Sequence, residues 1–375
     1  MARDPDVILA GDIGGTSTRL GIVSSAGSGF SRTSDVGSGF SRTSGVVSGL
    51  SRTRTFESAS LHSLDEAIDQ FLDDGRDVIE AACFGVAGPV IDGRATLPNL
   101  PWTVDSALVA RRLGLPSVPV LNDLEANAYG IATLTTDDLV AVNEARPAAH
   151  ANAAILSVGT GLGEAGLYWD GAMHRPVASE GGHADFAPRT ELEIDLLHEL
   201  RRSASHVSYE RVLSGEGLYR IFTFLNRRAG RAQPEWVIEA ARRNAAPAAI
   251  SKAALEGTCE IAVEALRLFV SCLGAEAGNL ALRMMARGGV YLGGGIAPKI
   301  LPALRDGVFM KAFVDKGRMK GLLESIPVWV IRNDLTALSG AAHVAAMLLR
   351  SSPSRSAERL ASAIDASASA MSAGL

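Results

Sequence analysis

The sequence predicts an α/β protein built from two related lobes. Strand-like apolar runs alternate with helix-like segments, and polar residues of the kind that bind ligands stand at the ends of several strands. A pattern of strand, glycine turn and strand occurs twice, near residue 11 and again near residue 159. Functional sites of α/β proteins collect at the carboxyl edge of the sheet, so the strand ends are where site residues are expected.

The composition is that of a globular protein with a large buried core. Of 375 residues, 47% are hydrophobic and 21% are charged, which fits one large or two medium domains. The net charge of −5 gives no electrostatic reason to expect binding to nucleic acid or to an anionic membrane. Three widely spaced cysteines, no secretion-signal layout and no apolar run of ~18 residues predict a cytoplasmic protein without disulfides or zinc.

The first glycine turn lies between the apolar runs 7–10 and 19–23. Glycines let backbone N–H groups approach phosphate oxygens, a threonine adds a hydroxyl, and an aspartate can hold the hydration shell of a metal ion. Taken alone, the turn is equally compatible with an ordinary tight hairpin. The turn residues are Gly11, Asp12, Ile13, Gly14, Gly15 and Thr16.

An internal repeat with a period of about ten residues occupies 27–54. Ten residues are too few for a helical solenoid unit, so the repeat is interpreted as a tandem duplication in a surface hairpin or loop. Its alternating apolar and polar residues are compatible with a strand. A solvated insertion is favoured over a phosphate-binding role for its arginines.

The rest of the first half alternates helix and strand. Helix is predicted over 63–72, where Ser63 is the N-cap and Glu66 completes a capping box. A buried strand over 81–86 follows and ends in a glycine-proline loop.

A second helix and strand then lead to a polar pair. The helix is predicted over 106–113 and the strand over 118–121, and the strand ends in Asn122 and Asp123. An amide and a carboxylate at this position are candidate ligand-contacting residues.

The second half begins again with a strand and a glycine turn, which suggests that the two lobes are related. A long helical region covers about 250–287 and leads into a strand over 289–292 that closes in three glycines. Those glycines suit the close approach of a flat nucleoside, although a bare strand-to-helix turn explains them equally well. The two glycine elements comprise Gly159, Thr160, Gly161 and Gly163, and then Gly293, Gly294 and Gly295.

A polar cluster lies between the second glycine turn and the long helical region. Glu180, His183 and Glu210 stand beside glycines, and carboxylates and an imidazole can pair with sugar hydroxyls in fixed directions. His183 taken alone is more typical of a hydrogen-bonded structural histidine. Zinc has little support, because Glu180 and His183 have no second histidine or cysteine close by.

Taken together and in this order, the motifs resemble those of bacterial glucokinases of the type without a zinc motif, within the sugar kinase, heat-shock protein and actin superfamily. The resemblance covers nearly the whole chain, from Val7 to about Leu349. The motifs are GDIGGT at 11–16, PNLPW at 98–102, LND at 121–123, GTGLG at 159–163, EGGHADFAP at 180–188, ERVLSG at 210–215 and GGGI at 293–296.

This resemblance implies a two-domain actin-like ATPase fold, which is ribonuclease H-like, with a cleft between the domains. The small α/β domain would comprise 1–133 and about 334–375, including the repeat insertion 27–54 and a C-terminal extension 350–375. The large α/β domain would comprise 134–333. The resemblance further implies ATP and Mg²⁺ as cofactors, D-glucose as substrate and a homodimer.

The resemblance also assigns roles to residues. Asp123 is the expected catalytic base: a primary alcohol is a poor nucleophile, so a carboxylate must accept the proton of the 6-hydroxyl as the γ-phosphoryl group transfers in line. The three glycine elements would hold ATP, with Asp12 as an outer-shell partner of Mg²⁺. The expected sugar contacts are Asn99, Asn122, Glu180, His183 and Glu210.

The chain departs from the family pattern in three places. Ser17 stands where the family usually has Asn, the repeat lengthens an early loop by about twenty residues, and the tail beyond Leu349 extends past the usual end. We expect the repeat to project away from the catalytic centre and the tail to be a mobile or surface-packed helix.

Two alternatives remain open at this stage. One is a kinase for another hexose, such as fructose, mannose or an amino sugar, because pocket shape cannot be read from the sequence. The other is a sugar-responsive regulator with a kinase-like fold. It is disfavoured because about six residues precede the first strand, too few for a helix-turn-helix, and because the zinc-binding cysteines of the repressor branch are missing.

Overall fold

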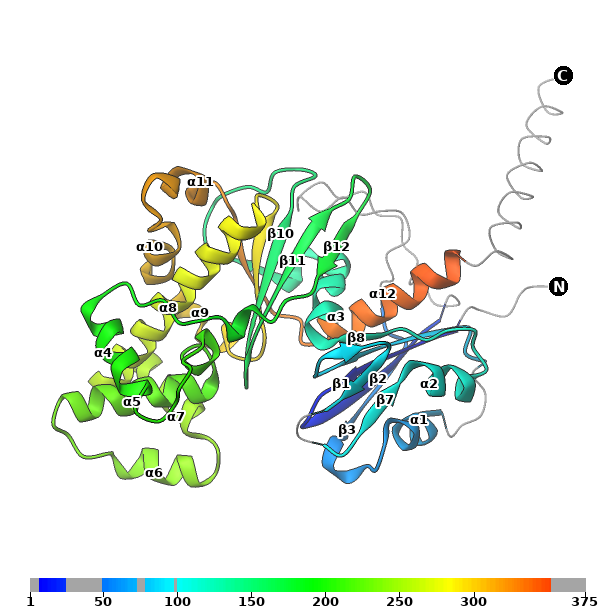
Figure 1. The fold of residues 1–375 in the computed structure, drawn as a ribbon, viewed down its shortest axis with the longest axis horizontal. Helices are drawn as coiled ribbons and strands as arrows, with labels where there is room; N and C mark the ends of the chain where they lie inside the picture. Colours follow the sequence, from blue (N-terminus) through cyan, green and yellow to red (C-terminus); the bar gives the residue numbers. More distant parts are fainter. Residues whose placement is uncertain (1–6, 25–48, 73–77, 98–99, 352–375) are drawn as a thin grey trace, which may run out of the picture. The chain divides into compact units, whose positions relative to one another are not determined.

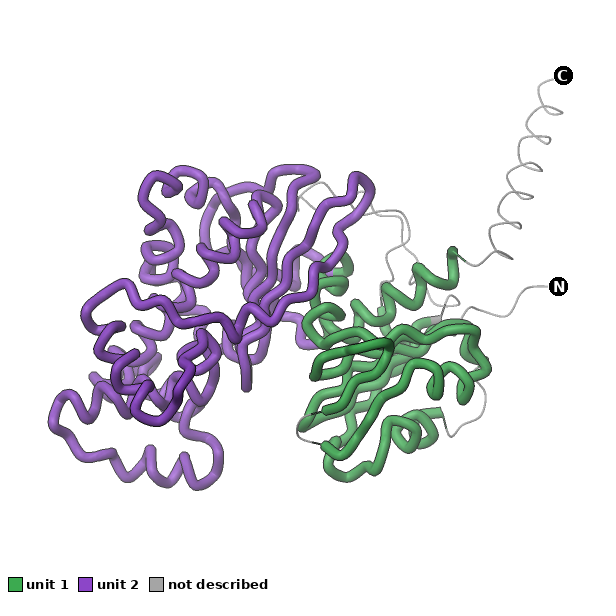
Figure 2. The backbone as a smooth tube through the Cα atoms, in the orientation of Figure 1, with its two compact units in different colours: residues 1–34, 42–133, 335–375 green, residues 35–41, 134–334 purple. Residues whose placement is uncertain are grey.

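The computed structural model describes residues 7–24, 49–72, 78–97 and 100–351, which divide into two compact units (Figure 2). Among these residues, unit 1 contains those up to 133 and from 335 onward, and unit 2 contains 134–334. Both units are mixed α/β (Figure 1), so the predicted fold class is confirmed. Asn99 and most of the predicted repeat insertion and C-terminal extension lie outside the described residues.

Unit 1 contains a five-stranded sheet in the order β3-β2-β1-β4-β8. Strands β1, β4 and β8 are parallel, and β2 and β3 extend the sheet as antiparallel neighbours. The first glycine turn joins β1 to β2, and the last pair of that hairpin is Ile13 with Thr18. The strands are β1 (Val7–Ile13), β2 (Ser17–Ser24), β3 (Arg52–Glu57), β4 (Ala81–Val86) and β8 (Val120–Asn122), with a small separate sheet of β5 (Val90–Ile91), β6 (Arg94–Thr96) and β7 (Thr103–Asp105).

Helices cover both faces of this sheet, because side chains alternate between the two faces along each strand. Leu9 and Ile13 of β1 belong to the core beneath α1 and α2, whereas Ile8 and Ala10 pack against α12. The helices of unit 1 are α1 (Leu64–Leu72), α2 (Ser106–Leu113), α3 (Asp123–Gly130) and α12 (Thr336–Ser351).

The start of α1 follows the predicted capping pattern with one difference. Ser63 Oγ accepts the N–H of Glu66, as predicted, at 3.2 Å. The Glu66 carboxylate reaches one residue further back than a capping box requires and accepts the N–H of His62 at 2.7 Å. Helix α1 is therefore capped by both side chains.

The described end of the repeat belongs to the sheet, because Arg52, Thr53 and Arg54 form the first half of β3. The guanidinium of Arg52 lies over the ring of Phe71, and that of Arg54 lies over the ring of Phe56. These two arginines therefore pack on aromatic side chains of unit 1.

Unit 2 repeats the strand order of unit 1. Its sheet runs β12-β11-β10-β13-β14-β9, with β10, β13 and β14 parallel and β11 and β12 antiparallel, and β9 adds a sixth strand beside β14. The second glycine turn joins β10 to β11, as the first joins β1 to β2. The strands are β9 (Leu139–Ala141), β10 (Ala153–Val158), β11 (Leu162–Trp169), β12 (His174–Val177), β13 (Gly289–Gly293) and β14 (Val328–Ile331).

Several helices pack around α8 to form the core of unit 2 (Figure 1). The helical region predicted over 250–287 is two helices rather than one, because the chain leaves α7 at residue 255 and Gly257 adopts a left-handed φ of 68°. No helix in the described part of the chain is both long and apolar enough to span a bilayer. The helices are α4 (Glu191–Leu200), α5 (Gly215–Arg228), α6 (Glu235–Arg242), α7 (Ala246–Leu255), α8 (Glu260–Met284), α9 (Leu301–Leu304), α10 (Val308–Val314) and α11 (Lys320–Glu324).

Candidate active site

The pair Asn122 and Asp123 forms the junction between β8 and α3 in unit 1. Asn122 is the N-cap of α3: its Oδ1 accepts the N–H of Leu124 at 2.9 Å, and its Nδ2 donates to the carbonyl of Gly88 at 3.1 Å. Asp123 is the first residue of the helix and is partly exposed. The cap therefore fixes the backbone from which the Asp123 carboxylate projects.

The helix that begins at Asp123 is supported by α12, which comes from the far end of the chain. A Cβ on Gly130 would overlap the carbonyl of Thr336, and one on Gly340 would overlap the carbonyl of Ala126, so the two helices touch backbone to backbone. Neither of these two helices was predicted from the sequence, so this support was missed there.

Glu125 is a residue near Asp123 that the sequence analysis missed. Burial raises the pKa of its carboxyl, and a hydrogen bond from the backbone N–H of Asn122 opposes that rise. The spacing from Asn122 to Glu125 is that of an N-cap and an N3 residue, so a capping-box search would have found it.

The first glycine turn is held by a side chain from the end of β3. Ser58 Oγ donates to the carbonyl of Gly14 at 2.8 Å, and Ser58 N–H donates to the carbonyl of Thr16 at 3.0 Å. Gly14 N–H donates across the turn to the carbonyl of Ser17 at 2.9 Å. Gly14 to Thr16 therefore form an ordered loop outside the core.

The other predicted residues of this turn lie deeper in β1. Gly11 and Ile13 are buried, and a Cβ on Gly11 would overlap the ring of Phe84, so packing alone requires a glycine there. Asp12 is partly exposed and offers the kind of oxygen ligand that Mg²⁺ prefers. The part of the motif that can meet a phosphate is thus Gly14, Gly15 and Thr16.

The structure brings the second and third glycine elements together in unit 2. Gly294 has a φ of 82°, and a Cβ there would overlap the backbone of Val158, the last residue of β10. The N–H of Ile296 donates to the carbonyl of Val158 at 3.1 Å. A Cβ on Gly295, in contrast, would meet nothing within 4 Å, so Gly295 borders open space.

The second glycine turn, between β10 and β11, also contacts the start of α5. The N–H of Gly215 donates to the carbonyl of Gly159 at 2.9 Å, and Gly159 N–H donates to the carbonyl of Gly161 at 2.9 Å. Two glycine loops and a helix start therefore meet around open space. Such a cradle fits a nucleotide, since no side chain blocks the backbone.

The three predicted sugar contacts of unit 2 lie close together. His183 Nε2 is 3.9 Å from Glu180 Oε2, and His183 Nδ1 is 4.0 Å from Glu210 Oε1. These separations exceed hydrogen-bond length, and the side chains of Glu180 and His183 are 70% and 59% exposed. The His183 ring is therefore exposed, and neither carboxylate is within hydrogen-bond distance of it.

Glu210 links this cluster to the second glycine turn. Its Oε2 accepts the N–H of Leu162 at 3.1 Å, and a Cβ on Gly161 would lie 2.5 Å from the same oxygen. One carboxylate thus holds the hairpin with one oxygen and faces His183 with the other.

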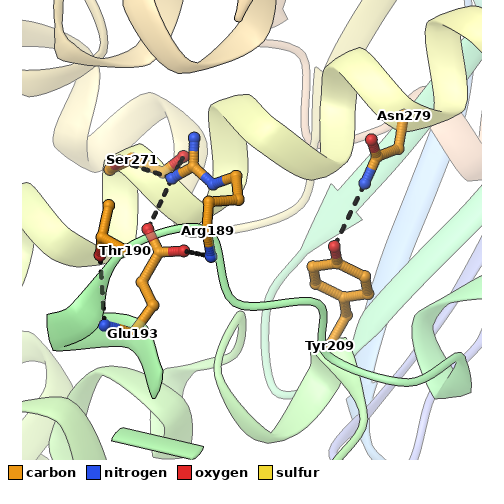
Figure 3. Close-up of polar contacts among 6 residues, drawn as sticks. All are labelled: Arg189, Thr190, Glu193, Tyr209, Ser271 and Asn279. Atoms are coloured by element: carbon orange, nitrogen blue, oxygen red, sulfur yellow. Dashed lines mark hydrogen bonds and ion pairs between the residues drawn. The ribbon is translucent and has the colours of Figure 1, made fainter. Parts of the chain in front are cut away.

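Partly buried polar contacts lie next to these segments (Figure 3). Arg189 donates to Glu193 Oε1 at 2.6 Å and to Ser271 Oγ at 2.9 Å, which ties α4 to α8. Asn279 Nδ2 of α8 donates to the hydroxyl of Tyr209, the residue before Glu210, at 3.2 Å. Helix α8 therefore anchors the loops on which the cluster is built.

Two features of the site remain, the predicted sugar contact Asn99 and metal binding. Asn99 lies outside the described residues, while Trp102 of the same motif is buried in unit 1. Within the described ranges, no group of three or more histidine, cysteine, aspartate or glutamate side chains is arranged to hold a metal ion.

Comparison with known proteins gives one consistent family. A family profile described as Glucokinase matches residues 9–348. A glucokinase from a Nostoc species is 40% identical over 357 residues, which cover 91% of this chain and 99% of the relative. A glucokinase from Saccharophagus degradans is 34% identical, with 89% of this chain and 96% of the relative covered.

Solved structures show the same similarity. The crystal structure of a glucokinase from an Antarctic psychrotroph is 31% identical and superposes with a TM-score of 0.76, covering 91% of this chain and 98% of the other. A ROK family glucokinase from Streptomyces griseus, in complex with glucose and AMPPNP, is 22% identical with a TM-score of 0.58, covering 92% of this chain and 99% of the other. At that identity the second structure supports the fold alone.

Proposed function

The chain belongs to the glucokinase family, and from this premise we propose that it transfers the γ-phosphoryl group of ATP to the 6-hydroxyl of D-glucose. One observation carries the proposal beyond family membership. Glu180 and Glu210 each have a carboxylate oxygen within 4.0 Å of the His183 ring, and Glu210 also holds the glycine hairpin. A sugar cluster and a phosphate turn joined by one side chain suit a sugar kinase.

In the proposed reaction, Asp123 accepts the proton of the 6-hydroxyl. The alcohol oxygen then attacks the γ-phosphorus as the bond to the leaving ADP breaks, and the proton stays on the Asp123 carboxyl until product release. Asn122, whose backbone is fixed by its own cap, orients a neighbouring hydroxyl. We assign Asn99 to a further hydroxyl by its motif alone.

The remaining sugar hydroxyls are assigned to unit 2. The carboxylates of Glu180 and Glu210 accept hydrogen bonds from hydroxyls, and the His183 ring donates or accepts one according to its tautomer. This fixed set of directions orients the sugar ring, so that one hydroxyl is presented for transfer.

The glycine elements are assigned to ATP. Backbone N–H groups of Gly14, Gly15 and Thr16 suit phosphate oxygens, and the open side of Gly295, beside Gly159, suits the nucleoside. Mg²⁺ bound with ATP would supply charge neutralisation at the β- and γ-phosphate oxygens, with Asp12 on its hydration shell.

We also propose a homodimer, a cytoplasmic location and a division into a small domain that corresponds to unit 1 and a large domain that corresponds to unit 2. These proposals rest on the family resemblance and on the division of the described residues. Light scattering of the purified protein tests the first.

The decisive experiment for the proposed function is a coupled assay with a panel of sugars and donors. Glucose, fructose, mannose and glucosamine are compared at fixed ATP, and ATP, ADP and polyphosphate are compared at fixed glucose. We expect the highest kcat/KM with glucose and ATP. A higher kcat/KM with another hexose would replace the proposed substrate and leave the kinase assignment in place.

A further inference from the structure

Five polar side chains of unit 2 lie next to the segments that carry Glu180, His183 and Glu210, and three of the five, Glu164, Tyr209 and Glu276, are buried. We call them the buried acid network. They come from β11, α8 and the short turn Tyr209–Arg211, and no role in sugar or nucleotide binding has been assigned to them above. The members are Glu164, Tyr209, Glu276, Asn279 and Arg283.

One end of the network supports the turn Gly181–His183. A Cβ on Gly181 would lie 2.5 Å from Glu164 Oε2, so the backbone of this turn rests directly on the Glu164 carboxyl. Gly181 is flanked by Glu180 and leads to His183 within the same turn. A displacement of the Glu164 side chain is therefore passed to two of the assigned sugar contacts.

The other end supports Glu210. The hydroxyl of Tyr209 accepts a hydrogen bond from Asn279 Nδ2, and the same amide donates to Glu276 Oε2 at 2.8 Å (Figure 3 shows the first of these bonds). Because Tyr209 and Glu210 are adjacent in one short turn, the position of Glu276 is coupled to that of Glu210.

The network holds two carboxyls against one guanidinium. Arg283, whose side chain is 47% exposed, pairs with Glu276 and lies 3.3 Å from Glu164, and the side chains of Glu164 and Glu276 are 1% and 0% exposed. The neighbouring ion pair of Arg189 and Glu193 has one charge of each sign (Figure 3). The two buried carboxylates share the one guanidinium that contacts both of them, so a proton on one carboxyl removes the repulsion between them.

The hydrogen bonding calls for the same proton. Glu164 Oε1 is buried and accepts no hydrogen bond from the residues that the structure describes. A proton shared between Glu164 and Glu276 satisfies that oxygen, since a protonated carboxyl can donate to its neighbour.

The pKa shifts of the groups around Glu164 and Glu276 also favour a protonated carboxyl. Burial, and then the charge of Glu276, raise the pKa of Glu164 to about 8, although Arg283 opposes the shift. Burial and Glu276 also raise the pKa of the Tyr209 hydroxyl, which stays protonated. Lys316 faces Glu276 as well, and burial lowers the pKa of its ammonium group.

We propose that Glu164 and Glu276 share one proton at neutral pH and that this proton positions the turns Gly181–His183 and Tyr209–Arg211 for glucose. Glu164 and Glu276 are thus positioning residues that act through Gly181 and Tyr209. The inference rests on the proposed function, because it takes Glu180, His183 and Glu210 as the glucose contacts. Loss of the shared proton places two like charges side by side, and both turns shift.

The kinetic test follows the KM for glucose from pH 7 to pH 9. We expect a rise of about five-fold in the wild-type protein, a typical size for coupling through packed neighbours, with a smaller change in kcat. Glu164→Gln is neutral at every pH and can still donate to Glu276, so its KM should stay near the pH 7 value. Glu239→Gln, which alters an exposed carboxylate of α6, is the matched control and should behave as the wild type does.

An unchanged rise in Glu164→Gln would overturn the proposal and assign the pH effect to Lys316 or another group. If Glu164→Gln does not fold, Glu276→Gln removes the same proton equilibrium from the other side and carries the same expectation.

A measurement without substrate keeps this test separate from the proposed function. A carboxyl with a raised folded pKa contributes stability that is complete below its ordinary value of 4.5 and is lost as pH rises through about 8. The thermal midpoint of the wild type should therefore fall between pH 5 and pH 8 more steeply than that of Glu164→Gln. If the thermal midpoints of the wild type and of Glu164→Gln fall equally steeply with pH, the proposal of a shared proton is overturned. If they fall unequally but the protein does not phosphorylate glucose, only the proposed function is overturned.

Discussion

The two sheets share one strand order, but the glycine hairpin of each is held by different chemistry. In unit 1 a neutral hydroxyl, that of Ser58, bonds to the turn. In unit 2 a carboxylate, that of Glu210, bonds to the N–H of Leu162 and also faces His183. The glycine hairpin of unit 1 is thus held by a side chain outside the proposed sugar contacts, whereas that of unit 2 is held by Glu210, which is one of them.

A second comparison concerns the step from the last parallel strand to a helix. The residues Asn122-Asp123-Leu124 follow β8, and Asn333-Asp334-Leu335 follow β14. Asn122 caps its own helix, whereas the Asn333 amide donates to Asp138 Oδ1 at 3.0 Å. The two segments have similar sequences, but we expect them to have separate roles: a catalytic role at Asp123 and a structural role at Asp334.

The largest expected effect distinguishes these two aspartates. Asp123→Asn should lower kcat by about 10²- to 10⁴-fold, because the amide cannot accept the proton of the 6-hydroxyl. Asp334→Asn is the matched control and should lower kcat by less than about three-fold. Steady-state kinetics with a thermal unfolding curve for each variant measures both. Equal losses in the two variants would contradict the assignment of the base.

The next effect concerns adjacent glycines of unit 2. Gly294→Ala should lower the free energy of unfolding by about 3 kcal/mol, because the new methyl group combines a positive φ with an overlap of the Val158 backbone. Gly295→Ala should change it by less than about 0.5 kcal/mol, since its Cβ meets open space. Urea unfolding gives both values, and a Gly295→Ala loss as large as that of Gly294→Ala would refute the open side of the cradle.

A third effect compares how pH acts on the two units. Burial, and then the charge of Arg350, lower the pKa of His343 in α12 of unit 1 to about 4. Neutral His343 therefore contributes to the free energy of unfolding above its ordinary pKa of 6.5. This contribution is lost as pH falls toward 4, because the unfolded chain takes up the proton first. His343→Gln should reduce the acid loss of stability by on the order of 2–3 kcal/mol between pH 7 and pH 4. If stability falls equally between pH 7 and pH 4 in the wild type and in His343→Gln, His343 does not titrate in this way.

The smallest effect tests the two hairpins directly. Glu210→Gln should raise the KM for glucose about ten-fold and the KM for ATP by less, because one carboxylate serves both segments. Ser58→Ala should raise the KM for ATP about three-fold and leave the KM for glucose unchanged. A Ser58→Ala effect on glucose would mean that the unit 1 hairpin is coupled to the sugar after all.

Local elements were predictable where local patterns decide them. Strand β4 and helix α2 have the predicted bounds, because an apolar run and a helical periodicity are properties of neighbouring residues. The predicted long helical region was wrong in its continuity, since Gly257 ends one helix and a new one begins at Glu260. A glycine inside an apolar region gave no clear signal of that break.

The support of the site was less predictable. Glu125 had a readable signal in its spacing from Asn122, and Glu164 is a lone carboxylate in an otherwise apolar strand, which is itself a warning of a buried partner. Ser58 had no such signal, because a serine after a strand is commonplace. Its role depends on a contact with Gly14, 44 residues earlier in the chain.

The sequence by itself determined the alternation of strands and helices, the glycine turns and the family, because each is set by residue type and short-range order. Only the tertiary structure decided which side chains meet. Glu210 reaches Leu162 across 48 residues, and Arg283 reaches Glu164 across 119. Such pairs form because packing of the sheet against α8 brings distant segments together, and no local preference encodes the distance between them.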